Sequence, residues 1–102
     1  MYIYGGRLDS GRLNDLWQFD CETQMWHCLC ENNNPSNPVI RSGCLLEHDN
    51  HNSLYVGFGY DTHPVAHNEM FRYDLTTRVW SGPLVPSDKV SPNARINFRS
   101  WF

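Results

Sequence analysis

Residues 14–26 read Asn-Asp-Leu-Trp-Gln-Phe-Asp-Cys-Glu-Thr-Gln-Met-Trp, and the same skeleton returns at residues 68–80 as Asn-Glu-Met-Phe-Arg-Tyr-Asp-Leu-Thr-Thr-Arg-Val-Trp. Each matched position lies 54 residues further on. The same offset, without a gap, carries Gly5 onto Gly59 and Arg41 onto Arg95. A fixed period of this length is typical of proteins built from one repeated supersecondary unit. The sequence therefore predicts two copies of one unit.

Short runs of aromatic, β-branched and other apolar residues between turn formers predict an all-β chain, because no stretch has a 3.6-residue apolar period. The expected strands are 1–6, 16–20, 24–30, 42–47, 53–59, 69–74, 78–82 and 95–102. The expected loops are 7–13 and 60–67, with proline-rich connections at 31–38 and 83–94. Four antiparallel strands per unit at this period predict β-propeller blades.

About two blades of a larger propeller are therefore expected. Residues 1–40 would hold three strands of a first blade and a connection, 41–94 a complete blade and its connection, and 95–102 the first strand of a following blade. Because a blade buries only part of its apolar surface alone, roughly three or more copies are usually needed for stability. We expect the sequence to be part of a longer protein, completed by the rest of its own propeller or by self-association.

These spaced features resemble the kelch repeat, in a style more similar to muskelin and host cell factor than to the BTB-kelch group. The motif is a double glycine, a spacer, an aromatic strand that ends at Asp, a tryptophan six residues later and an arginine before the next blade. Its matches here are Gly5, Gly6, Asp20, Trp26 and Arg41, then Gly59, Asp74, Trp80 and Arg95. The second copy departs at the double glycine, where Tyr60 stands at the place of Gly6.

The resemblance implies structural roles for these residues. The glycines let a neighbouring backbone or an indole lie against the strand, and the indoles of Trp26 and Trp80 cover apolar area between blades. The arginines are expected to bond loop carbonyls or aspartates. The chemistry of Asp20 itself indicates a turn in which its side chain accepts hydrogen bonds from amides two residues on.

Four cysteines, Cys21, Cys28, Cys30 and Cys44, invite a disulfide or metal hypothesis. At three of these positions the other repeat carries an apolar residue, which favours buried, reduced thiols. The Asn34-Pro35-Ser36 triplet contains proline at its centre and is no glycosylation acceptor. Both observations favour a reducing setting, the cytoplasm or alternatively the nucleus.

Charge and motif content exclude several classes of function. Eight basic and eleven acidic residues give a net charge of −3 without a basic stripe, so neither nucleic acid nor a membrane surface is an expected partner. The histidines are expected in loops without converging ligands, so we predict no metal, no cofactor and no catalytic residue. Some kelch propellers are copper or iron enzymes, and a metal-dependent enzyme is therefore the alternative.

The leading hypothesis is a module for protein–protein interaction. In kelch propellers the loops between second and third strands share one face with the connections between blades, and that face binds partner peptides in many members. The candidate partner-binding residues are Arg7, Arg12, Tyr60, Asp61, His63 and His67. By resemblance the role would be the substrate-recognition part of a ubiquitin ligase adaptor or a scaffold. Structural or cytoskeletal attachment is a further alternative.

Overall fold

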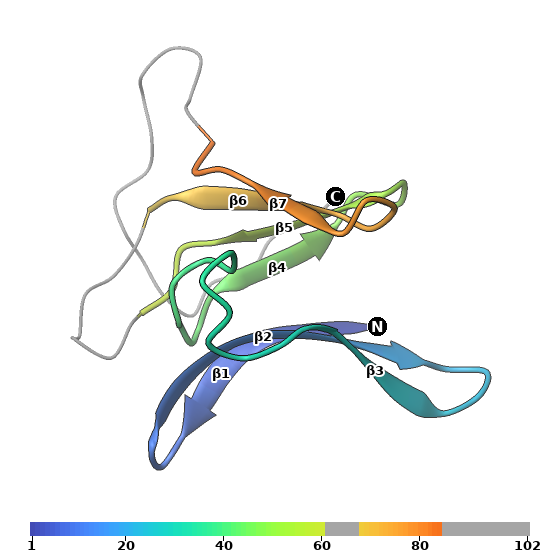
Figure 1. Cartoon of the computed structure of the whole chain (residues 1–102), viewed down its shortest axis with the longest axis horizontal. Helices are drawn as coiled ribbons and strands as arrows, with labels where there is room; N and C mark the ends of the chain where they lie inside the picture. The colour runs from blue at the N-terminus through green and yellow to red at the C-terminus, as the bar shows by residue number, and fades with distance from the viewer. Residues whose placement is uncertain (61–67, 85–102) are drawn as a thin grey trace.

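Seven strands form two antiparallel sheets in the computed structural model, which describes residues 1–60 and 68–84 (Figure 1). The first sheet has the order β1-β2-β3 and the second β4-β5-β6-β7. The strands are β1 Tyr2–Leu8, β2 Gly11–Asp20, β3 Met25–Cys30, β4 Leu45–His48, β5 Ser53–Gly57, β6 Met70–Asp74 and β7 Val79–Ser81. The described residues contain no helix, and hence none that could span a membrane. The all-β prediction is confirmed, and the three-plus-four strand pattern is that of propeller blades.

The two copies fold alike at the turn that follows β2 in the first sheet and β6 in the second. Asp20 Oδ1 accepts hydrogen bonds from the amides two and three residues on, at 2.9 and 3.3 Å. Asp74 Oδ1 does the same at 2.9 and 3.0 Å. Each aspartate carbonyl also accepts the amide four residues on at 2.7 Å. Backbone amides favour the ionised form, so they lower the pKa of both carboxyl groups.

Residues 7–13, which were expected to form a loop, instead form the tip of the β1–β2 hairpin. β1 continues to Leu8 and β2 begins at Gly11, so only Asp9 and Ser10 form the turn. Arg7 pairs with Arg12 across it. Polar residues on a solvent-facing hairpin fit an antiparallel ladder as well as a loop, which is why composition misled here.

The gapless offset of 54 is wrong for β1 and β5, the strands that precede the spacer of the motif. Tyr2 pairs with Gln18, whereas Arg72, which is 54 residues after Gln18, pairs with Tyr55, only 53 residues after Tyr2. The backbone angles agree with the shorter offset. Gly5 and Gly6 have φ values of 66° and 117°, and the matching pair is Phe58 and Gly59, at 56° and 91°. In the repeat, Tyr60 therefore corresponds to Arg7 and not to Gly6.

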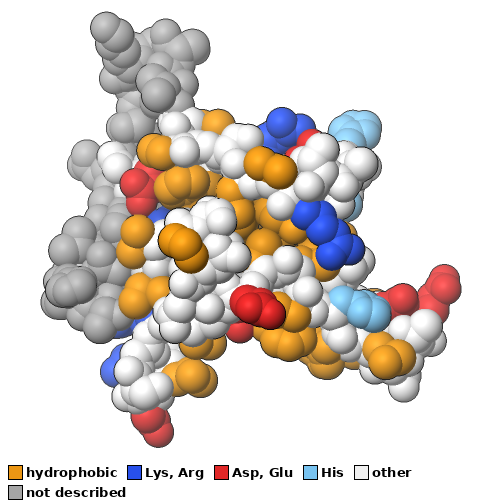
Figure 2. Space-filling view, viewed as in Figure 1, with side chains coloured by type: hydrophobic (Ala, Val, Ile, Leu, Met, Phe, Trp, Pro, Cys, Tyr) orange, Lys and Arg blue, Asp and Glu red, His pale blue; other side chains and the backbone are white. Residues whose placement is uncertain are grey.

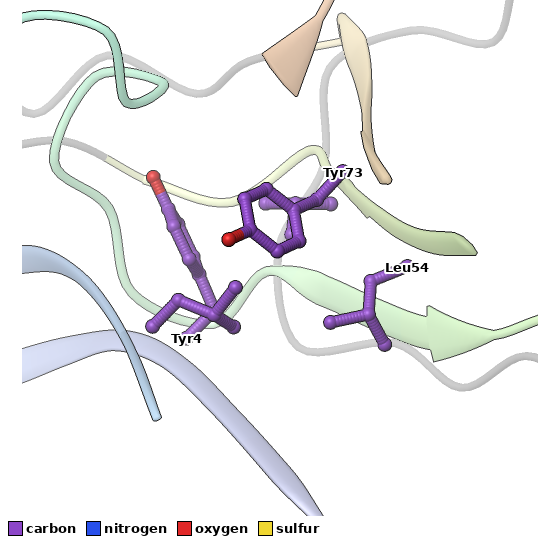
Figure 3. Packing of buried hydrophobic residues seen from close by; sticks show 5 residues of the cluster. Tyr4, Leu54 and Tyr73 are labelled. Atoms are coloured by element: carbon purple, nitrogen blue, oxygen red, sulfur yellow. The ribbon is translucent and has the colours of Figure 1, made fainter. Parts of the chain in front are cut away.

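The hydrophobic core lies between the two sheets. Tyr4 and Leu16 come from the first sheet and meet Leu54, Val56 and Tyr73 of the second. Figure 3 shows Tyr4 and Tyr73 converging from opposite layers. Figure 2 shows hydrophobic side chains gathered along the seam between the layers. Trp80 closes this core, because its indole lies 4.9 Å from the Tyr73 ring and 5.6 Å from the Tyr4 ring, centroid to centroid.

Arg41 joins the two sheets from the connection between them. Its carbonyl accepts from Gly6 at 2.9 Å, so its backbone lies against the first sheet. A Cβ on Gly5 would lie 2.5 Å from this same carbonyl oxygen, which is why a side chain is excluded there. The fully buried guanidinium donates to the Phe58 carbonyl at 3.0 Å and to Glu69 at 3.2 Å in the second sheet. The close neighbour of the glycine is thus backbone, and not an indole.

Two expectations about side-chain positions are wrong, and one is not tested. That Trp26 covers an interface between blades stays a prediction, because its indole is 46% exposed in this chain and contacts Phe19, 4.9 Å away between centroids. Cys21 and Cys28 are exposed, whereas Cys30 and Cys44 are partly buried, and all four thiols are free. His48 lies in β4 and not in a loop. For Trp26 and Cys28 the physical reason is the same, since that face of the first sheet has no described layer over it.

Candidate functional site

One end of the molecule brings together the β1–β2 hairpin and the connection between the sheets, at the left in Figure 1. We call this area the hairpin–connection surface, defined by residues 8–13, 31–42 and Tyr60. The β2–β3, β4–β5 and β6–β7 turns lie at the opposite end of the sheets (Figure 1). Side chains on turns and connections are free to vary without disturbing the core, so this end can carry recognition.

Asn14 fixes the course of the connection. Its amide group donates to the Pro38 carbonyl at 3.1 Å, and its side-chain oxygen accepts from the Asn33 amide at 2.7 Å. The Tyr4 hydroxyl donates to the same Pro38 carbonyl at 2.9 Å, and burial raises the pKa of this phenol well above its usual range. Asn37 ties the connection to the second sheet by accepting from the Trp80 indole at 3.2 Å. Side chains of both sheets therefore hold the connection in place.

Arg12 is the cation of the surface, and two contacts orient it. Its Nε donates to Ser42 Oγ at 2.8 Å, and its Cζ lies 5.4 Å from the centre of the Tyr60 ring. Ser42 and Tyr60 exchange two backbone hydrogen bonds of 2.9 Å, which hold these two contacts of Arg12 together. A guanidinium oriented in this way keeps further N–H groups for an acceptor.

A pocket of about 390 Å³ opens beside Arg12. Its walls combine the hairpin with the connection, and its lining residues are Leu8, Ser10, Gly11, Arg12, Leu13, Asn32, Asn33 and Ile40. Apolar side chains and amide groups line it together with one positive charge. Such a lining suits an extended segment that presents carbonyl or carboxylate oxygens together with a small apolar side chain.

The family comparison fits this architecture. The model of the Attractin/LZTR1 beta-propeller matches residues 1–95. This chain belongs to that β-propeller family. A search of curated proteins found no match.

The propeller brings together only part of the predicted partner-binding set. Arg12 and Tyr60 are in contact, while Arg7 is exposed on the neighbouring hairpin strand. Asp61, His63 and His67 lie outside the described residues, as do Arg95 and the strand expected at 95–102. In the described ranges 1–60 and 68–84, no group of three or more His, Cys, Asp or Glu side chains could hold a metal ion.

Sequence reasoning missed the polar residues that organise this end of the propeller. Ser42 orients Arg12, Asn32 and Asn33 line the pocket, and Asn37 accepts from Trp80. The asparagines lie in a stretch dense in turn formers, which hid their individual roles. A usable signal was the recurrence of an asparagine, Asn14 and Asn68, at the start of each motif, since the polar atoms of a buried asparagine need hydrogen-bond partners.

Proposed function

We propose that this propeller binds a partner protein through the hairpin–connection surface, which takes up an extended segment of that partner. The observation that carries the proposal is Arg12, held between Ser42 and Tyr60 beside the pocket. An oriented guanidinium loses little side-chain entropy on binding, so its hydrogen bonds contribute more to affinity. The asparagine amides of the lining suit the backbone of an extended chain.

The finer assignment is a kelch-type propeller that acts without catalysis. It is supported by the recurring Asp and Trp positions, by the glycine that both copies share at Gly6 and Gly59, and by the family's compatibility with an interaction module. In this proposal the chain serves as the substrate-recognition part of a ubiquitin ligase adaptor or as a scaffold. Four free thiols favour a cytoplasmic or nuclear setting.

The test begins with proteins retained by the immobilised chain and continues with the purified partner and calorimetry. Arg12→Ala should weaken binding at least about tenfold, because one oriented charged hydrogen bond contributes roughly 1.5–3 kcal/mol. The matched control is Arg78→Asn, an exposed arginine in the β6–β7 turn at the opposite end, where asparagine tolerates the φ of 60°. The control should bind as the unchanged chain does.

Two results would overturn the proposal. One is equal affinity of the Arg12→Ala variant and the unchanged chain for every retained partner. The other is the absence of any retained protein together with stoichiometric copper or iron by elemental analysis, which would favour the metal-dependent enzyme. Co-pelleting with filaments, unaffected by Arg12→Ala, would instead favour cytoskeletal attachment.

A further inference from the structure

The side chain of Asn32, on the wall of the pocket beside Arg12, is anchored at one of its two polar ends. Its Oδ1 accepts a hydrogen bond from the backbone amide of Asn14 in β2 at 2.9 Å. Because a backbone N–H can only donate, the side-chain oxygen must face β2 and the NH2 group must point away from it. Within residues 1–60 and 68–84, this NH2 group has no hydrogen-bond partner.

The anchor of Asn32 is itself fixed. The side-chain oxygen of the buried Asn14 accepts from the Asn33 amide at 2.7 Å, so Asn14 and the connection exchange two hydrogen bonds. The Asn37 side chain donates to the Asn14 carbonyl at 2.9 Å and closes the network. The Asn32 amide group is therefore oriented before a partner arrives and loses little freedom on binding.

The polar groups of the pocket that are oriented in this way are donors. Arg12 is held through its Nε by Ser42, and its guanidinium has no acceptor atom. Asn32 has an acceptor atom, but Asn14 already uses it. Asn33 lines the same pocket, yet its side chain makes no hydrogen bond in the described part of the chain and can turn either end outward. The hairpin and the connection thus each supply one donor of fixed direction.

The chemistry of this lining discriminates between possible partners. A partner that places an ammonium group here brings donors against donors, and the unpaired groups cost affinity. A carbonyl or carboxylate oxygen can instead accept from the guanidinium or from the amide. Three apolar side chains complete the lining and suit an apolar side chain of the same segment: Leu8, Leu13 and Ile40.

We propose that Asn32 determines specificity at the hairpin–connection surface, because its NH2 group donates to an oxygen of the bound segment beside the contact made by Arg12. The surface thereby selects a segment that presents carbonyl or carboxylate oxygens and rejects one that presents an ammonium group. This inference rests on the proposed function, since it concerns the same surface.

Asn32→Asp tests the donor without removing the anchor. A carboxylate oxygen accepts from the Asn14 amide as the amide oxygen does, so the urea midpoint should not fall. Calorimetry with the purified partner should show affinity at least about tenfold lower, because an acceptor replaces the donor. The matched control is Asn50→Asp, the same change in the exposed β4–β5 turn at the opposite end, where φ is 64°. The control should bind as the unchanged chain does.

Asn33→Asp separates direction from charge. It adds the same charge to the same pocket, but on a side chain that is free to turn aside, so it should lose less affinity than Asn32→Asp. Equal losses in the two variants would show that charge alone acts, and would overturn the proposal. Changing each Asp and Glu of the bound segment to its amide, and amidating its chain end, distinguishes a carboxylate from a backbone carbonyl as the oxygen held.

Nuclear magnetic resonance gives a readout that a merely structural asparagine would not change. The side-chain amide signals of Asn32, assigned through its backbone, should shift when the purified partner is added to the unchanged chain. Unshifted signals would overturn the proposal, even if the Asn32→Asp variant failed to fold. Full affinity of Asn32→Asp with weakened binding of Arg12→Ala would overturn this inference and leave the proposed function standing. Full affinity of both variants would overturn both.

Discussion

Trp80 and Trp26 occupy the same place in the repeat, but different surroundings give them different energetic roles. The Trp80 indole packs on Tyr4 and Tyr73 and donates to Asn37. Within the described part of the chain, the ring partner of Trp26 is Phe19, from its own sheet. The tryptophan at this repeat position therefore keeps the same kind of ring partner within its own sheet. The neighbouring sheet decides how much of its apolar area is buried.

This difference predicts unequal costs of truncation. Trp80→Ala should lower the free energy of unfolding by about 3 kcal/mol, because it removes a ring between the two sheets and leaves a cavity. Trp26→Ala should cost less than about 1 kcal/mol in the monomer, where the indole is half exposed. Urea unfolding at a low protein concentration measures both values. Equal losses would contradict the assigned surroundings.

Arg41 shows a second residue-scale effect, since its backbone bonds the first sheet while its buried guanidinium donates to acceptors beside the second. Arg41→Met should destabilise the chain by about 3 kcal/mol, because the Phe58 carbonyl and the Glu69 carboxylate lose this charged donor. Arg41→Lys should recover only part of the loss, since an ammonium cannot reproduce the planar fork. Arg72→Met, at a partly exposed arginine, is the control and should cost under about 1 kcal/mol. A fully stable Arg41→Met variant would count against the interlayer role.

At the scale of elements, the two aspartate turns are the most faithful copies in the molecule. Their hydrogen-bond pattern depends only on residues close in sequence, so the Asp-x-x-Thr spacing was sufficient to predict it. The strands β1 and β5, which precede the spacer of the motif, are different. Their register depends on where Arg41 enters the ladder and on which residues take positive φ angles. For that reason a gapless alignment misplaced Tyr60.

The turns also predict an acid response. Backbone amides lower the pKa of Asp20 and Asp74 in the folded state below the usual value of about 3.9. The stabilising contribution is therefore present above about pH 4 and is lost as the pH falls through the lower folded values. In the Asp20→Asn/Asp74→Asn double variant, the urea midpoint should fall less between neutral pH and about pH 3 than in the unchanged chain. An identical fall in both would rule out this source of acid sensitivity.

At the scale of the whole molecule, the repeat and its strand count were readable from sequence, because the motif spans two neighbouring strands and the turn between them. The hairpin–connection surface was readable only in outline. Within the described residues the β1–β2 hairpin and the connection between the sheets do come together, but the contact of Arg12 with Ser42 and Tyr60 joins residues 30 and 48 positions apart in the chain. Such contacts depend on how one sheet packs on the other, which no local pattern records.

The propeller's two ends make the central claim testable by one direct measurement. A photo-crosslinking amino acid is placed at Ser10, the exposed tip of the β1–β2 hairpin, and in a second variant at Glu22, in the exposed turn at the opposite end. Partner protein should be captured from Ser10 and not from Glu22, and Arg12→Ala should abolish the capture. Equal capture from both positions, or capture from Glu22 alone, would contradict recognition at the hairpin–connection surface.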